Sequence, residues 1–329
     1  MAEEVWMLQT KKADFKQIGA RFRIDPVTAR IIRNRGIEGE AAIDRYLNGT
    51  LDDLYDPMLL KDMERAVSIL CEAVDTGKKI RIVGDYDIDG VCSTYILLQA
   101  FERLGSDVDF EIPDRIKDGY GINESIIEQA HADGVEVILT CDNGISAFHQ
   151  VELAKKYGMT VVITDHHEVP LDGEKEKIPP ADAVIDPKQA DCPYPFPEIC
   201  GAVVAYKLVQ VLYARRGVPQ MEWLDLLEFA AIATVGDVMK LQDENRILVK
   251  YGLKKMAQTK NLGLRRLAEK NNLDLGAITA YHIGFVIGPC LNAGGRLKTA
   301  KEALALLRAQ SEEEAVRLAE ELKELNDTR

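Results

Sequence analysis

Residues 83–90 read VGDYDIDG, in which Asp85, Asp87 and Asp89 alternate with single residues directly after the apolar run at 80–83. Such a short apolar run is typical of a buried strand. Three carboxylates at the end of one strand repel one another, so the arrangement requires a nearby opposite charge, and we expect a metal ion there. Taken alone, the motif is equally compatible with a polar turn before a helix, where capping and the helix dipole favour carboxylates.

The stretches around this motif predict the fold. From Lys79 onward, short β-rich runs alternate with longer amphipathic runs: IRIV and VCSTYILLQAFERLG, then VDFEI, VEVILT and ISAFHQVELAKKYG, and finally MTVVIT and ADAVID. This alternation is typical of βαβ units. We therefore expect an α/β, doubly wound, mainly parallel sheet with helices on both faces. Gly105 and Gly158 stand where helix C-caps would fall.

Three regions follow from the pattern. Residues 1–76 are expected to form a helical lead-in, with apolar residues at helical spacing and a break at Asn34–Gly36. Residues 77–298 would form the main domain, in which a Pro-rich loop after Asp186 leads into a mostly helical part. Residues 299–329 would begin a further helix. We expect their acidic run, from Ser311, to be an exposed helix with paired charges.

Composition narrows the class of protein. The chain has 329 residues, 47% of them hydrophobic, and can bury a large core. We expect a soluble cytoplasmic protein, because the chain has no secretory signal pattern and no apolar run of roughly 18 residues. Its net charge of -13 argues against a broadly basic nucleic-acid-binding surface. The six cysteines form no C-x-x-C pair, which favours buried free thiols over zinc ligands or disulfides.

Two further predicted strands also end in hard metal ligands. VEVILT is followed by the CDNG motif at 141–144, and MTVVIT by the DHHE motif at 165–168. Because ligands of parallel sheets bind beyond the carboxyl ends of the strands, we expect these loops to meet at one rim. CDNG alone could be a turn and a lone histidine is usually structural, but the three motifs together are hard to explain as turns. His131, His149 and His282 lie on predicted helices, at the surface or in packing.

The ligand chemistry indicates a reaction class. Carboxylates with one or two histidines suit Mg²⁺ or Mn²⁺ better than metals that prefer thiolates. The number of carboxylates allows two ions bridged by a shared aspartate, an arrangement that activates water and neutralises charge on a phosphate. The residues therefore predict metal-dependent phosphoester hydrolysis without a nucleophilic side chain.

These motifs carry a family resemblance. GDYDIDG, CDNG and TDHH, in this order and spacing, resemble the DHH phosphoesterase superfamily. Other segments resemble its bacterial branch of single-strand-specific 5′→3′ DNA exonucleases. They are NRGI (34–37), LDDLYDPMLLKDMERAV (51–67), PDRIKDGYG (113–121), TVGDVMKLQDENRILV (234–249) and GPCLNAGGRL (288–297). The resemblance covers almost the whole chain.

The resemblance implies roles for individual residues. Asp142 would bridge two Mn²⁺ or Mg²⁺ ions, Asp165 would orient neighbouring groups, and His167 would contact the scissile phosphate as part of the catalytic set. Arg115, Asn292 and Arg296 would bind substrate, with the two arginines holding a 5′-terminal phosphate. The implied metal ligands are Asp85, Asp87, Asp89, Asp142, His166 and Asp237. Asp237 follows only from the resemblance, since it lies in a helical region without a nearby cluster.

The chain departs from the family pattern in two places. Cys290 stands where many relatives have arginine, so a cation is missing there, and we interpret the thiol as a packing residue. Relatives also continue through a connecting helix into a second, DHH-associated domain. Because the sequence stops at Arg329, inside the expected helix, we expect a fragment or truncated product without that second domain. We expect the 77–298 domain to bind metal but to have weak exonuclease activity, since several phosphate contacts would be lost.

The resemblance implies 5′→3′ hydrolysis of single-stranded DNA carrying a 5′ phosphate, in DNA repair and recombination. Single-strand-binding protein and a RecQ-type helicase are the implied protein partners, and we expect a monomer. One alternative is a DHH phosphoesterase acting on small nucleotides or oligoribonucleotides. Such relatives usually carry a histidine where this chain has Val83. Another alternative is a non-catalytic replication-associated scaffold, although such proteins usually lose metal ligands that are all present here.

Overall fold

A five-stranded parallel sheet forms the centre of the molecule. The computed structural model describes residues 7, 11–114 and 121–328. In space the strands run in the order β2, β1, β3, β4 and β7, and every pairing is parallel, as the alternating pattern predicts. Their bounds are β1 Ile80–Val83, β2 Val108–Glu111, β3 Val137–Cys141, β4 Thr160–Thr164 and β7 Ala183–Ile185.

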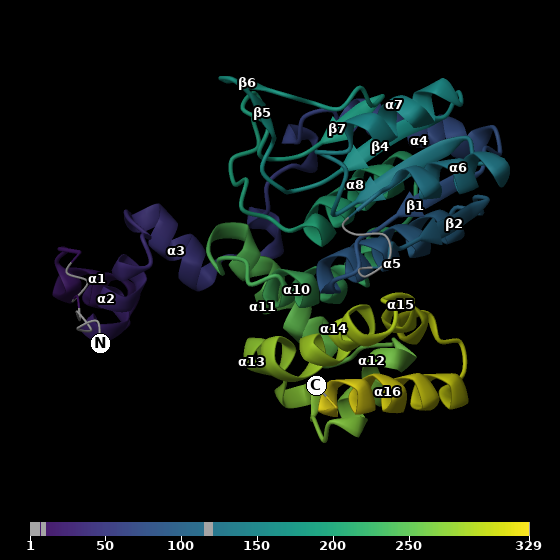
Figure 1. Ribbon diagram of the computed structural model, residues 1–329. Coiled ribbons are helices and arrows are strands. Elements are labelled where there is room, and N and C mark those ends of the chain that lie inside the picture. Colours follow the sequence, from purple (N-terminus) through teal and green to yellow (C-terminus); the bar gives the residue numbers. More distant parts are fainter. Residues whose placement is uncertain (1–6, 8–10, 115–120, 329) are drawn as a thin grey trace, which may run out of the picture.

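Helices cover both faces of this sheet (Figure 1). Helices α4 (Met63–Asp75), α5 (Ile88–Arg103) and α8 (Gly201–Arg215) share one hydrophobic core with alternate strand residues such as Leu139. Helices α6 (Glu124–Ala132) and α7 (Phe148–Lys156) pack on the other face, against residues such as Ile138. Successive residues of the central strands therefore enter opposite cores, which is why β3, β4 and β7 are almost entirely apolar.

The ends of α5 and α7 follow from local chemistry. Asp87 caps α5, since its side chain accepts hydrogen bonds from the backbone N–H groups of Asp89 (2.9 Å) and Gly90 (3.1 Å). The capping interpretation of this motif is therefore correct for Asp87. Gly105 and Gly158 follow α5 and α7 with φ of 72° and 79°, which glycine adopts without strain.

The remaining elements are almost all helical. α10 (Leu227–Gly236) packs extensively on α5, α8 and α11 (Asp243–Met256), and thereby joins the helical part to the sheet. The only other strands among the described residues are the antiparallel pair β5 (Leu171–Asp172) and β6 (Lys175–Glu176). The other helices are α1 Phe15–Phe22, α2 Pro26–Asn34, α3 Glu40–Asn48, α9 Gln220–Leu224, α12 Leu262–Lys270, α13 Ala280–His282, a π-helical turn Ile283–Ile287, α14 Gly288–Leu297, α15 Lys301–Arg308 and α16 Glu312–Asp327.

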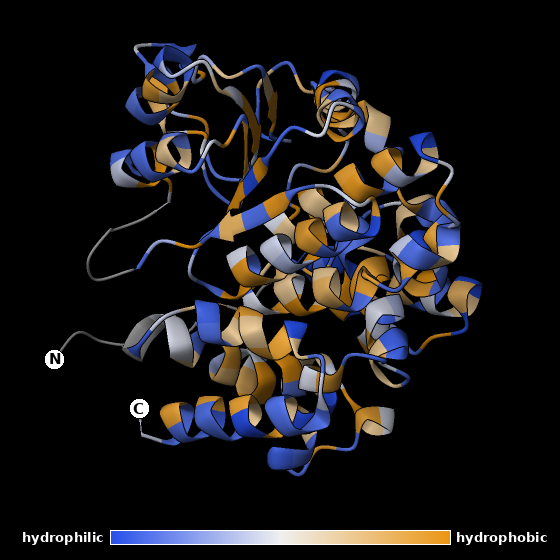
Figure 2. Cartoon of the chain, turned by 90° about the vertical axis from the view of Figure 1, so that its right-hand side faces the viewer, coloured by the Kyte–Doolittle hydropathy of each residue, from blue (hydrophilic) through white to orange (hydrophobic). Residues whose placement is uncertain are grey.

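Helix α16 corrects one expectation. Its outer face carries the predicted ion pairs, Arg317–Glu321 (2.7 Å) and Lys323–Asp327 (2.6 Å). The helix is nevertheless not simply exposed, because Leu318 and three other apolar residues are buried against α12 and α14. Figure 2 shows this division as hydrophobic and hydrophilic residues alternating along the helix that leads to the C-terminus. The high charge of the segment concealed its narrow apolar stripe.

All six cysteines are free, and four of them are buried. The prediction of unpaired, mostly buried thiols is therefore confirmed. None of the helices in the described part of the chain has the length and apolar character that crossing a bilayer requires.

A buried ion pair joins α8 to α11. Lys207 and Glu244 are 1% and 0% exposed, and the Lys207 Nζ lies 3.0 Å from Glu244 Oε2. Lys207 also donates to the backbone oxygen of Tyr55 (3.1 Å), and the Tyr194 hydroxyl donates to Glu244. Removing one member leaves the other charge buried without compensation, which costs more than the intact pair contributes.

We expect Lys207→Met to lower the free energy of unfolding by about 3–5 kcal/mol, measured by urea denaturation. The double variant Lys207→Met, Glu244→Gln should recover part of this loss, because no net charge then remains buried. Lys240→Met is the matched control, since the Lys240–Glu198 pair is exposed (3.2 Å) and should contribute below about 1 kcal/mol. A loss as small for Lys207→Met as for the control would contradict this account.

Candidate metal centre

The carboxyl ends of three adjacent strands bring the predicted residues together. Asp85 follows β1 by two residues, Asp142 directly follows β3, and the segment Asp165–His167 directly follows β4. Because β3 lies between β1 and β4, the three loops meet at one edge of the sheet. The predicted rim is therefore present in the fold.

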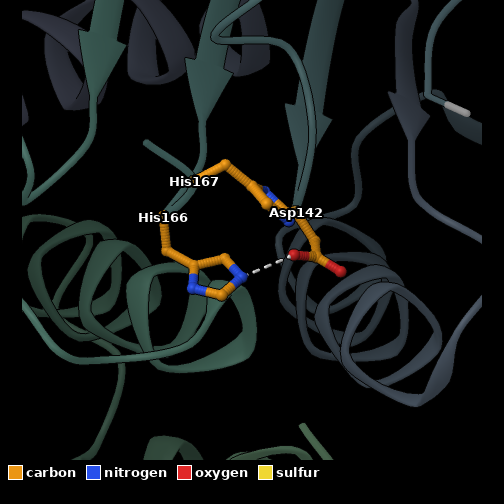
Figure 3. A group of neighbouring side chains, drawn as sticks. All are labelled: Asp142, His166 and His167. Carbon is orange, nitrogen blue, oxygen red and sulfur yellow. Dashed lines mark ion pairs between the residues drawn. The ribbon is translucent and has the colours of Figure 1, made fainter. Parts of the chain in front are cut away.

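Three groups of side chains at the carboxyl ends of these strands could each hold a metal ion. Within each group, one ligand atom per residue lies within 4.8 Å of the others. Asp142 belongs to two groups and His166 to two, so the groups form one continuous cluster. Figure 3 shows the Asp142 carboxylate facing the His166 ring, with Nε2 3.0 Å from Oδ1. The groups are Asp142, His166 and His167; Asp89, His166 and Asp237; and Asp85, Asp87 and Asp142.

Asp237 reaches the cluster from the helical part of the chain. It is the C-cap of α10, and its Oδ2 lies 3.9 Å from His166 Nε2. Residue spacing gave no sign of this, because Asp237 lies 69 residues beyond the end of the DHHE motif. The packing of α10 against α5 and α8 brings the aspartate to the rim.

Asp89 is held by the N-terminus of α8. Its two carboxylate oxygens accept the backbone N–H groups of Gly201 (2.6 Å) and Ala202 (2.8 Å). The positive end of the helix dipole thus faces the carboxylate cluster and offsets part of its repulsion. Asp89 Oδ2 remains 3.4 Å from His166 Nε2.

Gly201 permits this close approach. A Cβ atom on Gly201 would lie 2.7 Å from the Asp142 Cβ and 2.9 Å from its Oδ1. Any larger residue would displace Asp142 or the start of α8. The sequence signal for this contact is the glycine at the start of the helix, directly after the Pro-rich loop, and it was not predicted because glycine is not a metal ligand.

Burial and mutual repulsion favour protonation of the carboxyl groups when no cation is present. Burial, followed by the charge of Asp87, raises the pKa of Asp85 to about 7. Burial and the charges of Asp89 and Asp87 likewise raise the pKa of Asp237 to about 7. The pKa of Asp142 is raised well above its ordinary value, first by burial and then by the surrounding aspartates.

Asp165 organises the histidine segment. Its carboxylate accepts the backbone N–H groups of Ile145 (2.9 Å) and His166 (2.7 Å), and it bonds the His167 ring through Nδ1 (2.7 Å). Burial is the largest single effect and opposes both charges, but the hydrogen bonds and the attraction between opposite charges together outweigh it. They lower the pKa of Asp165 and raise the pKa of His167 to about 9. Burial lowers the pKa of His166, which favours the neutral, metal-binding imidazole.

The donor set fits a hard divalent cation. Asp85 Oδ1 is buried and has no hydrogen-bond partner among the described residues. Buried acceptors of this kind normally have a partner, and a cation would supply one. Carboxylate oxygens with imidazole nitrogen suit Mg²⁺ or Mn²⁺.

Asp186 lies near Asp165 and His167, but no sequence motif predicted it. It directly follows β7, is 0% exposed, and accepts the backbone N–H of Lys188 (2.8 Å). Burial and the charge of Asp165 raise its pKa to about 7. Its place after the ADAVID strand was the available signal, since the residues after β1, β3 and β4 were identified in the same way.

The predicted substrate residues are only partly described. Asn292 lines a hollow of about 250 Å³ together with Asp87 and Asp237, beside the cluster. Arg115 lies outside the described residues, as does the side chain of Arg296. Cys290 is buried in the main hydrophobic core, which agrees with its interpretation as a packing residue.

The fold and the cluster together define an α/β protein with a carboxylate–histidine centre at the carboxyl edge of its sheet. Residues 79–234 match the model of the DHH family, N-terminal domain. The chain therefore belongs to the DHH family.

Within this family the chain is similar to the RecJ exonucleases. It is 37% identical to the single-stranded-DNA-specific exonuclease RecJ of Bacillus subtilis over 98% of this chain and 40% of that protein. It is 36% identical to Escherichia coli RecJ over 93% of this chain and 53% of that protein. The Thermus thermophilus RecJ structure with Mn²⁺ matches with a TM-score of 0.79 and 32% identity over 95% of this chain and 44% of that one. Another RecJ structure, bound to manganese, matches with a TM-score of 0.73 and 35% identity over 82% of this chain and 66% of that one. The chain thus spans about half the length of the curated relatives it matches.

We expect Asp142→Asn to stabilise the metal-free protein while weakening metal binding. A raised carboxyl pKa lowers stability as pH rises above about 4, so removing the ionisable group should raise the melting temperature at pH 8 in chelator. Loss of a shared ligand should weaken Mn²⁺ binding by more than about 100-fold in calorimetry, beyond the effect of changing an outer partner. A variant that is destabilised without metal would contradict the repulsion described here.

The Asp165–His167 pair predicts a shifted histidine titration. In metal-free protein, NMR titration of the His167 ring should give a pKa of about 9, and Asp165→Asn should return it towards about 6.5. Because the folded pKa is raised, the pair stabilises the fold fully below about 6.5 and loses this effect as pH rises through about 9. His167→Gln identifies the resonance. A pKa near 6.5 in the unsubstituted protein would refute the pairing.

Proposed function

We propose that this chain carries the hydrolytic core of a metal-dependent exonuclease that degrades single-stranded DNA from the 5′ end. The observation that carries the proposal is a cluster of three ligand groups, two of which share Asp142 and two of which share His166. The cluster lies at the carboxyl ends of the strands of a DHH domain. Similarity to the RecJ exonucleases along 93–98% of the chain supports the choice of substrate.

We assign the metal-binding role to the side chains of the cluster. Asp142 would bridge two Mn²⁺ or Mg²⁺ ions, because it belongs to two of the three groups. The bound ions would supply an activated water and neutralise charge on the phosphate. The full ligand set in this proposal is Asp85, Asp87, Asp89, Asp142, His166 and Asp237.

His167 would act on the substrate. With its Nδ1 bonded to Asp165, the ring presents Nε2 and stays protonated at neutral pH. A cationic donor of this kind suits the charge that develops on a phosphate oxygen. Asn292 would contact the single-stranded DNA from the hollow beside Asp87. Arg115 and Arg296 would hold its 5′ phosphate.

The proposal includes the setting of the reaction. Single-stranded DNA with a 5′ phosphate is the proposed substrate, and single-strand-binding protein and a RecQ-type helicase are the proposed partners, in the cytoplasm. We propose a monomer with three parts: a helical lead-in (residues 1–76), the DHH domain (residues 77–298) and the start of a connecting helix (residues 299–329). Support for the setting comes from the similarity to bacterial single-stranded-DNA-specific exonucleases.

The test is Mn²⁺-dependent release of nucleotides from a 5′-phosphorylated, single-stranded oligonucleotide. We expect release from single strands, little from the matching duplex, and loss of at least about 1,000-fold in Asp142→Ala, equivalent to about 4 kcal/mol. Lys155→Ala is a matched control, since its ion pair with Asp182 (2.6 Å) lies away from the cluster, and it should retain activity.

Two outcomes would overturn the proposal. Equal cleavage of dinucleotides and long strands would indicate a phosphoesterase for small substrates. Metal binding by calorimetry without release from any nucleic acid would instead support a non-catalytic role.

A further inference from the structure

A second cavity lies away from the metal centre. It encloses about 510 Å³ and is lined by α5, by the helices from α8 to α10, and by the segment that joins α11 to α12. Tyr95 and Phe229 contribute aromatic rings to its wall, with centroids 4.3 Å apart. This volume is within the range of small-molecule sites.

Glu228 places a buried carboxyl group in the wall of the cavity. The residue lines the cavity yet is only 4% exposed. Its Oε1 accepts a hydrogen bond from the Thr259 hydroxyl (2.7 Å), whereas Oε2 has no partner among the described residues. A buried carboxyl oxygen without a partner is costly, and such a group in a native fold requires an explanation.

The other charged groups of the wall already have partners. Arg103 donates to Glu222 (Nη2 to Oε1, 3.0 Å). Asp225 accepts from Lys255 (2.6 Å) and from Lys260 (3.2 Å). Neither lysine forms an ion pair with Glu228 in the described part of the chain. The unsatisfied group that a ligand would meet is therefore the Glu228 carboxyl.

The cavity and the metal centre occupy opposite ends of the same helices. Glu228 lies at the start of α10 and Asp237 at its end, so the two are separated by about 13 Å along the axis. Tyr95 and Arg103 likewise lie along α5 beyond Asp89, which is in its first turn. A small ligand in the cavity cannot also touch the metal cluster.

We propose that this cavity is a second ligand site, which binds a flat group carrying two adjacent N–H donors. One donor would satisfy Glu228 Oε2 and the other would share Oε1 with Thr259, while the flat face would lie against the aromatic wall. Guanidinium groups and the guanine base both present this donor pair. The carboxylate geometry selects the pair, and the aromatic rings select a planar ligand.

The test is calorimetric titration of the full chain with agmatine and, separately, with guanosine. At least one should bind. Binding of agmatine would identify a guanidinium ligand, and binding of guanosine would identify a guanine ligand. Putrescine, a cation without a flat group, and adenosine, which lacks the donor pair, should bind at least about tenfold more weakly. Absence of binding by both agmatine and guanosine at millimolar concentration would overturn the proposal.

Three variants locate the site. Glu228→Gln keeps the shape and the Thr259 bond but loses the charge and an acceptor, so affinity should fall at least about tenfold. Gln258→Trp, at an exposed position on the cavity wall, should block binding while leaving the core intact, and it provides the test if Glu228→Gln fails to fold. Asp237→Asn should leave binding unchanged. Unaltered affinity in both cavity variants, or loss of binding in Asp237→Asn, would refute the assignment and leave the proposed nuclease function unaffected.

Discussion

Repulsion among buried carboxylates at the edge of the sheet is the constraint on which this structure depends. The fold brings Asp85, Asp87, Asp89 and Asp142 together where water is scarce, and burial with mutual charge raises the pKa of three of them. The N-terminus of α8 opposes part of this repulsion by binding Asp89. A divalent cation would oppose the remainder, so the protein stores an unfavourable arrangement that a metal would relieve.

Close packing of the surrounding helices holds this arrangement in place. Helices α5, α8 and α10 pack closely on one another, and each has one end at the metal cluster. The buried Lys207–Glu244 pair connects α8 to α11 behind them. Local strain and repulsion persist at functional sites when the neighbouring packing determines the positions of the groups, as it does here.

The sequence predicted most of the sheet and much of the site because both depend on short-range patterns. Apolar runs of four or five residues, glycine at helix ends and carboxylates directly after strands are local features. The buried stripe of α16 was not predicted, because only four apolar residues form it and charged residues dominate the rest of the helix. Asp186 was overlooked for a similar reason, since it is a single carboxylate without a surrounding motif.

By itself, the sequence determined the five strands of the central sheet and that three of them end in carboxylates or histidines able to hold a metal, because these properties reside in neighbouring residues. Only the tertiary structure decided that β3 lies between β1 and β4, so that the loops meet. It also decided that Asp237 joins them and that Gly201 allows α8 to approach Asp142. Those contacts join residues far apart in the chain, and they depend on how helices pack rather than on any local pattern.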